Sequence, residues 1–332
     1  MTFKPFYDII EIMMNRVCSL FSGIGGIDLG FKQAGFKIIW ANEIDKAACE
    51  TYKANFGDEH LVNCDIRKVD TKDIPDFDIL VAGFPCQPFS LAGKQKGFCD
   101  ARGQLFFEIK RIIHDKKPPI IFLENVANLI EHDNGKSFEQ VYLSLMEEGY
   151  AVRYATQNPK THANIPQQRD RVFIVAFLDI DQCNRFQYPE KMPLTTKITD
   201  LIDTHEKHND CYYYKDTHPL YVEMCSKVKE KGLIHRITDH GVSVKGSDVC
   251  PTLTANMGTY PDRVHILRDN FGIRKLTPYE CLQLQGYPKE FKFPKGRTLP
   301  QAYKQIGNSV CVPIIKNIAK KILLCIWFQS AK

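Results

Sequence analysis

The chain has 332 residues, 44% of them hydrophobic, which is enough to bury a substantial core in one large domain or two unequal ones. Its 44 Lys and Arg residues exceed its 39 Asp and Glu residues by five, a slight excess that favours a polyanionic partner only weakly. The 12 cysteines include no Cys-x-x-Cys pair and no signal peptide precedes them, so we expect free thiols in the cytoplasm. Lysines interrupt the only candidate membrane span, Val310–Phe328, and we expect no membrane partner.

After an N-terminal extension of residues 1–15, short apolar runs alternate with helical patterns. The runs predict buried strands at Val17–Phe21, Ile38–Trp40, Phe77–Val81, Ile120–Leu123 and Arg171–Phe177. Helical patterns cover Gly26–Ala34, Lys46–Asn55, Gln104–Asp115 and Ser137–Glu148, with Asp45 and Ser137 as N-caps. This alternation predicts an α/β fold with a parallel, doubly wound sheet, and ligands gather at the carboxyl ends of such strands.

The pattern becomes irregular from residue 188. Residues 188–273 hold a Tyr212–Tyr214 cluster and six of the ten histidines, and we assign them to a smaller second domain. Residues 274–299 are a second connection. Isoleucines from Ile314 to Ile326 then mark one face of a closing helix, so residues 300–332 are expected to rejoin residues 16–187.

A glycine turn follows the first predicted strand. Gly23, Gly25 and Gly26 precede a helix, and Glu43 stands twenty residues after Gly23, where a carboxylate can bind both hydroxyls of a ribose. Asp65 follows the third strand and can accept a hydrogen bond from an adenine amino group. The turn contains no basic residue, which disfavours a pyrophosphate and leaves an adenosyl ligand. The alternatives are a plain strand-to-helix turn and a surface acid.

Three further features carry chemical groups. Pro85 and Pro88 frame Cys86 at the end of a strand, although a lone cysteine is usually structural. The next strand ends at Glu124, an acid that burial can keep protonated, unless it is a surface acid. Arg169 and Arg171 alternate before the last strand and can hold a carbonyl oxygen, the Glu124 carboxyl group or a phosphate.

Taken together, six motifs in this order resemble the cytosine-C5 DNA methyltransferases of bacterial restriction-modification systems. They are Phe21–Gly26, Gly83–Ser90, Glu124–Val126, Gln167–Arg171, Arg274–Pro288 and Tyr303–Val310. The resemblance covers about residues 16–185 and 274–320. It implies a Rossmann-like S-adenosylmethionine-dependent methyltransferase domain in which residues 188–273 form the target-recognition domain.

The resemblance also implies a mechanism. A methyl group passes from S-adenosylmethionine to C5 of a cytosine flipped out of a short duplex site, leaving S-adenosylhomocysteine. By its motif, Cys86 is the nucleophile that adds to C6. Glu124 assists at N3 and the exocyclic amine, Arg171 holds O2, and Arg169 supports the surroundings of Glu124 and Cys86. No metal is implied.

Other site residues carry over from the same motifs. The donor contacts are Phe21, Gly23, Gly25, Glu43, Ile44, Asp65, Ile66, Pro85, Leu105, Asn308 and Ser309. The expected DNA contacts are Gln87, Ser90, Lys94, Arg102, Thr252 and Thr254, and residues 87–104 resemble a lid over the DNA. Ile44 departs from the tryptophan that is frequent beside the adenine.

The resemblance implies double-stranded DNA as the partner, a monomer, and a restriction endonuclease that acts on the same site without being bound. Two other functions stay open. The related tRNA methyltransferases carry a Pro-Pro-Cys motif and a Cys-Phe-Thr segment, whereas this chain has Phe84-Pro85-Cys86 and no Cys-Phe-Thr. A catalytically silent DNA-binding regulator is expected to lose the thiol or the acid, and Cys86 and Glu124 are both present.

Overall fold

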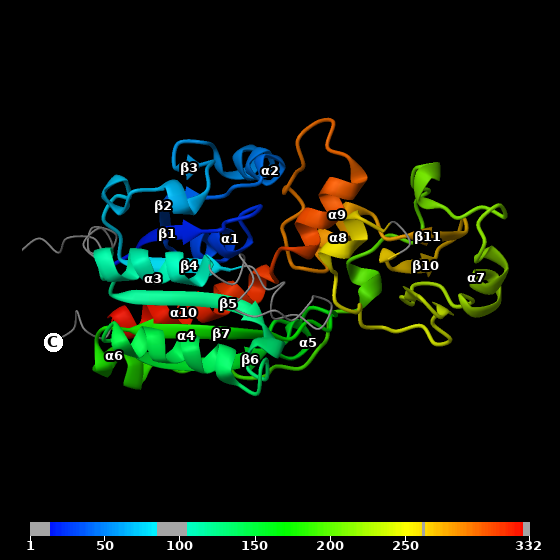
Figure 1. Ribbon diagram of the computed structural model, residues 1–332. Coiled ribbons are helices and arrows are strands. Elements are labelled where there is room, and N and C mark those ends of the chain that lie inside the picture. The colour runs from blue at the N-terminus through cyan, green and yellow to red at the C-terminus, as the bar shows by residue number, and fades with distance from the viewer. Residues whose placement is uncertain (1–13, 85–104, 261–262, 328–332) are drawn as a thin grey trace, which may run out of the picture.

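The computed structural model describes residues 14–84, 105–260 and 263–327. A seven-stranded sheet with the order β3-β2-β1-β4-β5-β7-β6 dominates the larger part of the molecule (Figure 1). Its strands are β1 (Arg16–Leu20), β2 (Lys37–Asn42), β3 (Leu61–Val62), β4 (Ile79–Gly83), β5 (Ile120–Val126), β6 (Ala151–Gln157) and β7 (Arg171–Phe177). The predicted α/β class is confirmed.

The sheet is mixed, so the prediction of a parallel sheet is wrong for β7, the one reversed strand of this sheet. Strands β1 to β5 pair in parallel, whereas β7 runs antiparallel to both β5 and β6. An apolar run indicates that a strand is buried on both faces, but it carries no information about the direction of the strand. Strand β6 was not predicted, because six of its seven residues are exposed or half-buried and they form no apolar run.

Helices cover both faces of the sheet. Alternate strand residues such as Val81 and Leu80 point to opposite faces and enter two separate cores. Helices α1 (Gly26–Gln33), α6 (Ile180–Arg185) and α10 (Val312–Trp327) pack on one face, and α3 (Leu105–Lys116) and α4 (Lys136–Glu147) on the other. A Cβ atom on Gly30 would lie 2.5 Å from Cβ of Ile315, so α1 and α10 approach closely, and the closing helix does rejoin the sheet.

The predicted helix starts at Gly26 and Lys46 agree with the structure, and the predicted start at Gln104 lies outside the described ranges. Asp45 precedes α2 (Lys46–Phe56), and its carboxylate accepts hydrogen bonds from the amides of Ala47 and Ala48, as expected for an N-cap. Ser137 is not an N-cap, because α4 begins one residue earlier, after Gly135. The Ser137 hydroxyl instead lies 2.7 Å from Nδ1 of His132.

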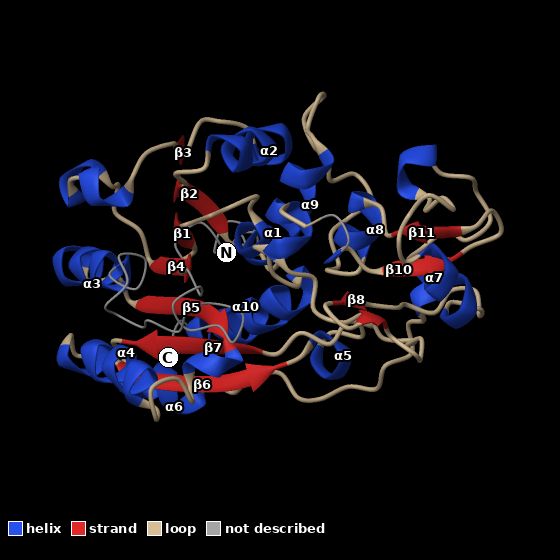
Figure 2. Cartoon of the chain, turned by 45° about the vertical axis from the view of Figure 1, so that its right-hand side comes forward, coloured by secondary structure: helices blue, strands red, loops and turns tan. Residues whose placement is uncertain are grey.

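The rest of the chain is built from short elements joined by loops (Figure 2). They are α7 (Tyr221–Lys227), β8 (Ile237–Thr238), β9 (Gly241–Val242), β10 (Ile266–Arg268) and β11 (Ile273–Lys275), with α5 (Pro159–His162) nearer the sheet. Single 3-10 turns cover Ile66–Lys68, Thr71–Asp73, Ala127–Leu129, Ile198–Asp200, Asp210–Tyr212 and Ala255–Gly258. Helices α8 (Pro278–Gln283) and α9 (Leu299–Gly307) lie between this irregular part and the sheet (Figure 1).

A third core joins the two parts. Met257 from the irregular part and Ile306 from α9 pack in one cluster with Ile24 of the glycine turn and Ala48 of α2. The ten cysteines within the described ranges are all free thiols. None of the helices in those ranges is both long and apolar enough to span a bilayer.

Candidate active site

The glycine turn has the open backbone that a ligand needs. Phe21, Gly23 and Gly25 follow β1 and have positive φ angles of 55°, 56° and 86°. This backbone conformation is strained for any residue except glycine. A Cβ atom on Gly23 would meet no atom within 4 Å, so this residue faces open space. A Cβ atom on Gly25 would lie 2.3 Å from the Phe56 ring, so the second glycine is required for packing.

Glu43 lies at the end of β2 and closes one side of this turn. Its Oε2 atom accepts a hydrogen bond from the Gly23 amide at 2.9 Å, and Oε1 accepts one from the Asp45 amide at 2.7 Å. Burial raises the pKa of Glu43 although these amides oppose the shift. Each oxygen keeps a lone pair for a further donor. The neighbouring Ile44 side chain is 62% exposed, so an apolar surface lies uncovered beside the carboxylate.

The loop after β3 forms the next side of the site. Asp65 accepts hydrogen bonds from the Arg67 amide and side chain, which lower the pKa of its carboxyl group. Ile66 is buried behind it. Sequence reasoning missed Asn42, whose side-chain amide donates to the carbonyl of Cys64 at 2.9 Å and thereby ties this loop to β2. A buried asparagine at a strand end, three residues before Asp45, was the available signal.

The C-terminal motif, Tyr303–Val310, lies against Gly26 at the end of the glycine turn. The Ser309 hydroxyl is hydrogen-bonded to the Tyr287 hydroxyl. A Cβ atom on Gly26 would lie 2.6 Å from Oγ of Ser309, so the two segments are in contact. Asn308 is exposed at the end of α9, and Leu105 begins α3 in a half-buried position.

Glu124 is buried at the carboxyl edge of the sheet and pairs with Arg171. The distance from Nε of Arg171 to Oε1 of Glu124 is 3.0 Å. The reversed direction of β7 makes this pair possible, because it puts the first residue of β7 opposite Val126 at the end of β5. Burial raises the pKa of Glu124, while the charges of Arg171 and Arg169 oppose the shift.

Asn125 holds the backbone that leads to the predicted nucleophile. Its side-chain amide donates to the carbonyl of Phe84 at 3.2 Å, and its Oδ1 atom accepts from the Val126 amide at 2.9 Å. Sequence reasoning gave this residue no role, although it stands beside Glu124 in the same motif. The predicted site residues outside the described ranges are Pro85, Cys86, Gln87, Ser90, Lys94 and Arg102.

Arg169 contacts the segment Thr252–Thr254, which holds the two predicted DNA contacts within the described ranges. Arg169 is 2% exposed and donates to the backbone carbonyls of Leu253, Gly307 and Ser309. The Thr252 hydroxyl donates to the carbonyl of Gln168 at 2.7 Å. Thr254 is exposed. The end of the irregular part therefore lies directly beside the Gln167–Arg171 motif.

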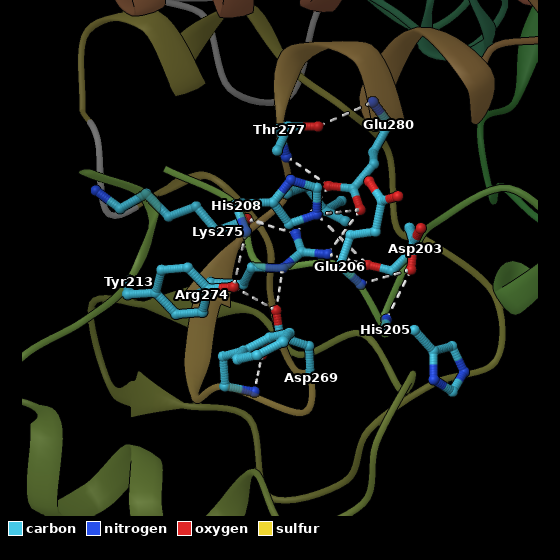
Figure 3. A network of polar contacts seen from close by, with 12 residues as sticks. Asp203, His205, Glu206, His208, Tyr213, Asp269, Arg274, Lys275, Thr277 and Glu280 are labelled. Atoms are coloured by element: carbon cyan, nitrogen blue, oxygen red, sulfur yellow. Dashed lines mark hydrogen bonds and ion pairs between the residues drawn. The ribbon is translucent and has the colours of Figure 1, made fainter. Parts of the chain in front are cut away.

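A second polar centre lies in the irregular part (Figure 3). The Arg274 side chain is fully buried and donates to Asp269 at 2.7 Å and to both oxygens of Glu280 at 2.7 and 2.8 Å. It also donates to the carbonyls of Lys275 and Asp203. Burial acts to raise the pKa of Asp269, but hydrogen bonds from the Phe271 amide, Tyr213 and Arg274 hold it below its ordinary value.

Comparisons with known proteins agree with this geometry. The model of the C-5 cytosine-specific DNA methylase family matches residues 15–324. The chain is 46% identical to the Type II methyltransferase M.Bsp6I of Bacillus sp. (strain RFL6), over 93% of this chain and 98% of that protein. It is 37% identical to the Type II methyltransferase M.HhaI of Haemophilus parahaemolyticus, over 92% of this chain and 94% of that protein.

Among solved structures, a DNMT2 variant from Spodoptera frugiperda gives a TM-score of 0.71 at 22% identity, over 93% of this chain and 99% of that one. The methyltransferase EhMeth of Entamoeba histolytica gives the same TM-score and identity, over 96% of this chain and 98% of that one. At this identity the likeness shows the fold alone. The family match and the sequence relatives go further: the chain belongs to the C-5 cytosine-specific DNA methylase family and is a DNA (cytosine-5) methyltransferase.

Proposed function

We propose that the chain methylates a cytosine within a short, specific duplex site, using S-adenosylmethionine as donor and Cys86 as covalent nucleophile. The observation that carries the proposal is the buried pair of Glu124 and Arg171 at the sheet edge, beside the end of the strand that leads to Cys86. A carboxyl group and a guanidinium group at this spacing match the N3 and O2 edges of a cytosine.

The residues around the glycine turn fit the donor. Glu43 has free lone pairs for the ribose hydroxyls, and the open side of Gly23 leaves room for the ligand beside the backbone. Asp65 and the apolar side chains of Ile44 and Ile66 suit an adenine. Asn308 and Ser309 suit the amino-acid end. When bound, S-adenosylmethionine supplies an electrophilic methyl group on a sulfonium centre.

The protein side chains then activate the cytosine. The Cys86 thiolate forms a bond to C6, while Glu124 donates a proton or hydrogen bond at N3 and Arg171 binds O2, so the added electron pair is delocalised towards C5. C5 then forms a bond to the methyl carbon of the donor, and the electron pair of the broken carbon–sulfur bond stays on the sulfur of S-adenosylhomocysteine. A base, which we propose is water, removes the C5 proton, and the electron pair of that bond expels Cys86 and restores the aromatic ring. The raised pKa of Glu124 supports its role as the proton donor.

Sequence recognition is assigned to residues 188–273, with Thr252 and Thr254 as contacts and residues 274–299 as the connection to the sheet. We propose a monomer in the cytoplasm that protects DNA in a restriction-modification system, with an endonuclease that acts on the same site without being bound. The names of the relatives as Type II methyltransferases support this setting. The adjacent position of Thr252 and Gln168 supports the DNA contact.

The test uses duplex DNA that contains 5-fluorocytosine in place of cytosine. A base cannot remove fluorine from C5 as it removes a proton, so the step that releases Cys86 is blocked. The wild-type protein with the donor is therefore expected to form a covalent adduct that survives denaturing electrophoresis. Cys86→Ala is expected to bind DNA without forming the adduct, and Cys211→Ala, at an exposed cysteine, serves as the matched control. Normal turnover by Cys86→Ala would show that the nucleophile is wrong, and methyl label appearing only in tRNA would contradict the DNA substrate.

A further inference from the structure

Three chain segments meet at the Arg169 guanidinium group. Nη1 donates to the carbonyl of Leu253 at 2.6 Å, and Nη2 donates to the carbonyls of Gly307 and Ser309 at 3.1 and 2.5 Å. Leu253 lies between Thr252 and Thr254, the predicted DNA contacts, and Ser309 is a predicted donor contact. One buried side chain therefore joins the segment assigned to DNA with the segment assigned to the donor.

The hydrogen bond from Arg169 to Gly307 lies at the carboxyl end of α9. The last carbonyls of a helix have no partner within the helix and carry a partial negative charge. Here the side-chain amide of Gln285 donates to the Ile306 carbonyl at 2.6 Å, and Arg169 donates to the Gly307 carbonyl. These side chains satisfy the end of α9 and fix the direction in which Asn308 and Ser309 leave it.

The same end of α9 is in direct contact with the DNA segment. A Cβ atom on Gly307 would lie 2.1 Å from the carbonyl carbon of Thr254 and 2.1 Å from the Ala255 amide nitrogen. Both are backbone atoms, so the contact permits no side chain at position 307. A shift of Thr254 must therefore move the end of α9, and a shift of α9 must move Thr254.

We propose that Arg169 is a positioning residue that couples DNA binding to donor binding through Leu253, Gly307 and Ser309. The inference rests on the proposed function, because it takes the donor and DNA contacts from it. DNA binds the segment around Thr252, and the donor binds Ser309. Both ligands favour the arrangement in which Arg169 bonds the carbonyls of Leu253, Gly307 and Ser309. Each ligand then tightens the other by the same factor.

Two variants separate this coupling from an effect of the Arg169 charge on Glu124. Arg169→Lys keeps the positive charge, but an ammonium group cannot reach three separate carbonyls in the planar geometry of a guanidinium. Gly307→Ala keeps Arg169 and forces the two backbones apart. Arg153→Lys is the matched control, since Arg153 lies on β6 and also bonds a backbone carbonyl, that of Cys183, at 3.3 Å.

The experiment measures the dissociation constant of S-adenosylhomocysteine by calorimetry, with and without a saturating duplex whose site bisulfite sequencing has identified. We expect DNA to tighten this binding at least about fivefold in the wild type and in Arg153→Lys. In Arg169→Lys and Gly307→Ala the effect is expected to fall below about twofold. Thermal unfolding of each variant shows whether it is folded, and the two variants act at different residues, so either one tests the coupling.

The possible failures have different meanings. Full coupling in a folded Arg169→Lys or Gly307→Ala would overturn the inference, as would a wild type whose product binding is indifferent to DNA. A changed pH profile of kcat in Arg169→Lys with the coupling intact would assign Arg169 to Glu124 instead. If the wild type binds neither S-adenosylhomocysteine nor DNA, the proposed function itself fails.

Discussion

Glu124 combines burial with a charged partner, and this combination decides its chemistry. Its side chain forms an ion pair with Arg171, and burial raises its pKa. A glutamine at this position keeps the shape of the side chain but cannot donate an acidic proton at N3. We expect Glu124→Gln to lower kcat by at least about 100-fold, as measured by methyl transfer from labelled donor to DNA. The dissociation constant of S-adenosylhomocysteine should change by less than about twofold.

The control for this variant is Glu139→Gln, which alters an exposed carboxyl group on α4. It is expected to turn over like the wild type. Glu124→Gln with turnover within about threefold of the wild type would remove Glu124 from the mechanism. Equal losses of product binding and turnover would indicate a structural role instead.

Asp28 is a second buried carboxyl group, and it makes stability depend on pH. It accepts hydrogen bonds from the hydroxyls of Ser19 and Tyr52, both at 2.6 Å, and burial raises its pKa from 3.8 to about 6. The folded protein therefore binds the proton more tightly than the unfolded chain. The contribution of this group to stability is complete below about pH 4 and is lost as the pH rises through about 6.

Asp28→Asn removes this titration. We expect the free energy of unfolding of the wild type, relative to the variant, to fall by up to about 3 kcal/mol between pH 4 and pH 7. Urea unfolding at both pH values measures the difference. Asp58→Asn, at an exposed position, is the control and should show no such trend. A pH-independent difference for Asp28→Asn would contradict the assignment.

At the scale of elements, sequence reasoning succeeded where the signal is local. The apolar runs located β1, β2, β4, β5 and β7, and the capping side chain of Asp45 located the start of α2. Two features depend on pairing with distant segments and could not be read in this way, namely the reversed direction of β7 and the half-exposed strand β6. The cap of α4 is local, but there Gly135 precedes the helix and the Ser137 hydroxyl contacts His132 instead.

Helices α2 and α9 are held together by buried and exposed polar contacts. The Thr51 hydroxyl donates to Oε1 of Gln305 at 2.9 Å, both residues being buried, and Lys304 lies 3.3 Å from the carboxylate of Asp45. Thr51→Val keeps the side-chain shape but leaves the buried Gln305 oxygen without its donor. We expect this variant to lose about 1–3 kcal/mol of unfolding free energy in urea.

Thr51→Ser retains the hydroxyl and is the matched control for that loss. It should keep the hydrogen bond and lose only the contribution of one buried methyl group, about 1 kcal/mol. If Thr51→Val proved as stable as the wild type, the bond to Gln305 would contribute nothing to the junction between α2 and α9.

At the scale of the whole molecule, the site is assembled from segments far apart in the chain. The sequence motifs named Glu43, Glu124, Arg171 and Ser309, and the structure brings their segments to one edge of the sheet. Only the fold places Ser309 on Gly26, because that contact spans most of the chain. The bonds from Arg169 to three carbonyls were not foreseen either, since backbone carbonyls leave no trace in a sequence motif.

The Arg274 network gives the irregular part an anchor separate from the donor site. Arg274 connects Asp203 and Asp269 from the irregular part to Glu280 on α8, with no exposed surface on its side chain (Figure 3). A lysine offers one charged nitrogen instead of a guanidinium fork, so Arg274→Lys cannot bond Asp269, both oxygens of Glu280 and the Asp203 carbonyl together, although Tyr213 and the Thr277 amide still donate to the two carboxylates. Breaking a buried pair of this kind costs about 3–5 kcal/mol.

This cost should be confined to the irregular part, to which we assign DNA recognition in the proposed function. For Arg274→Lys we expect the affinity for specific duplex DNA to fall at least about tenfold by fluorescence anisotropy, and S-adenosylhomocysteine binding without DNA to change by less than about twofold. Hydrogen exchange should accelerate at β10 and β11, whereas β4 and β5 keep their protection. Arg153→Lys on β6 should change neither affinity. Equal losses of DNA and product binding would show instead that Arg274 supports the whole fold, because the donor site shares no side chain with this network.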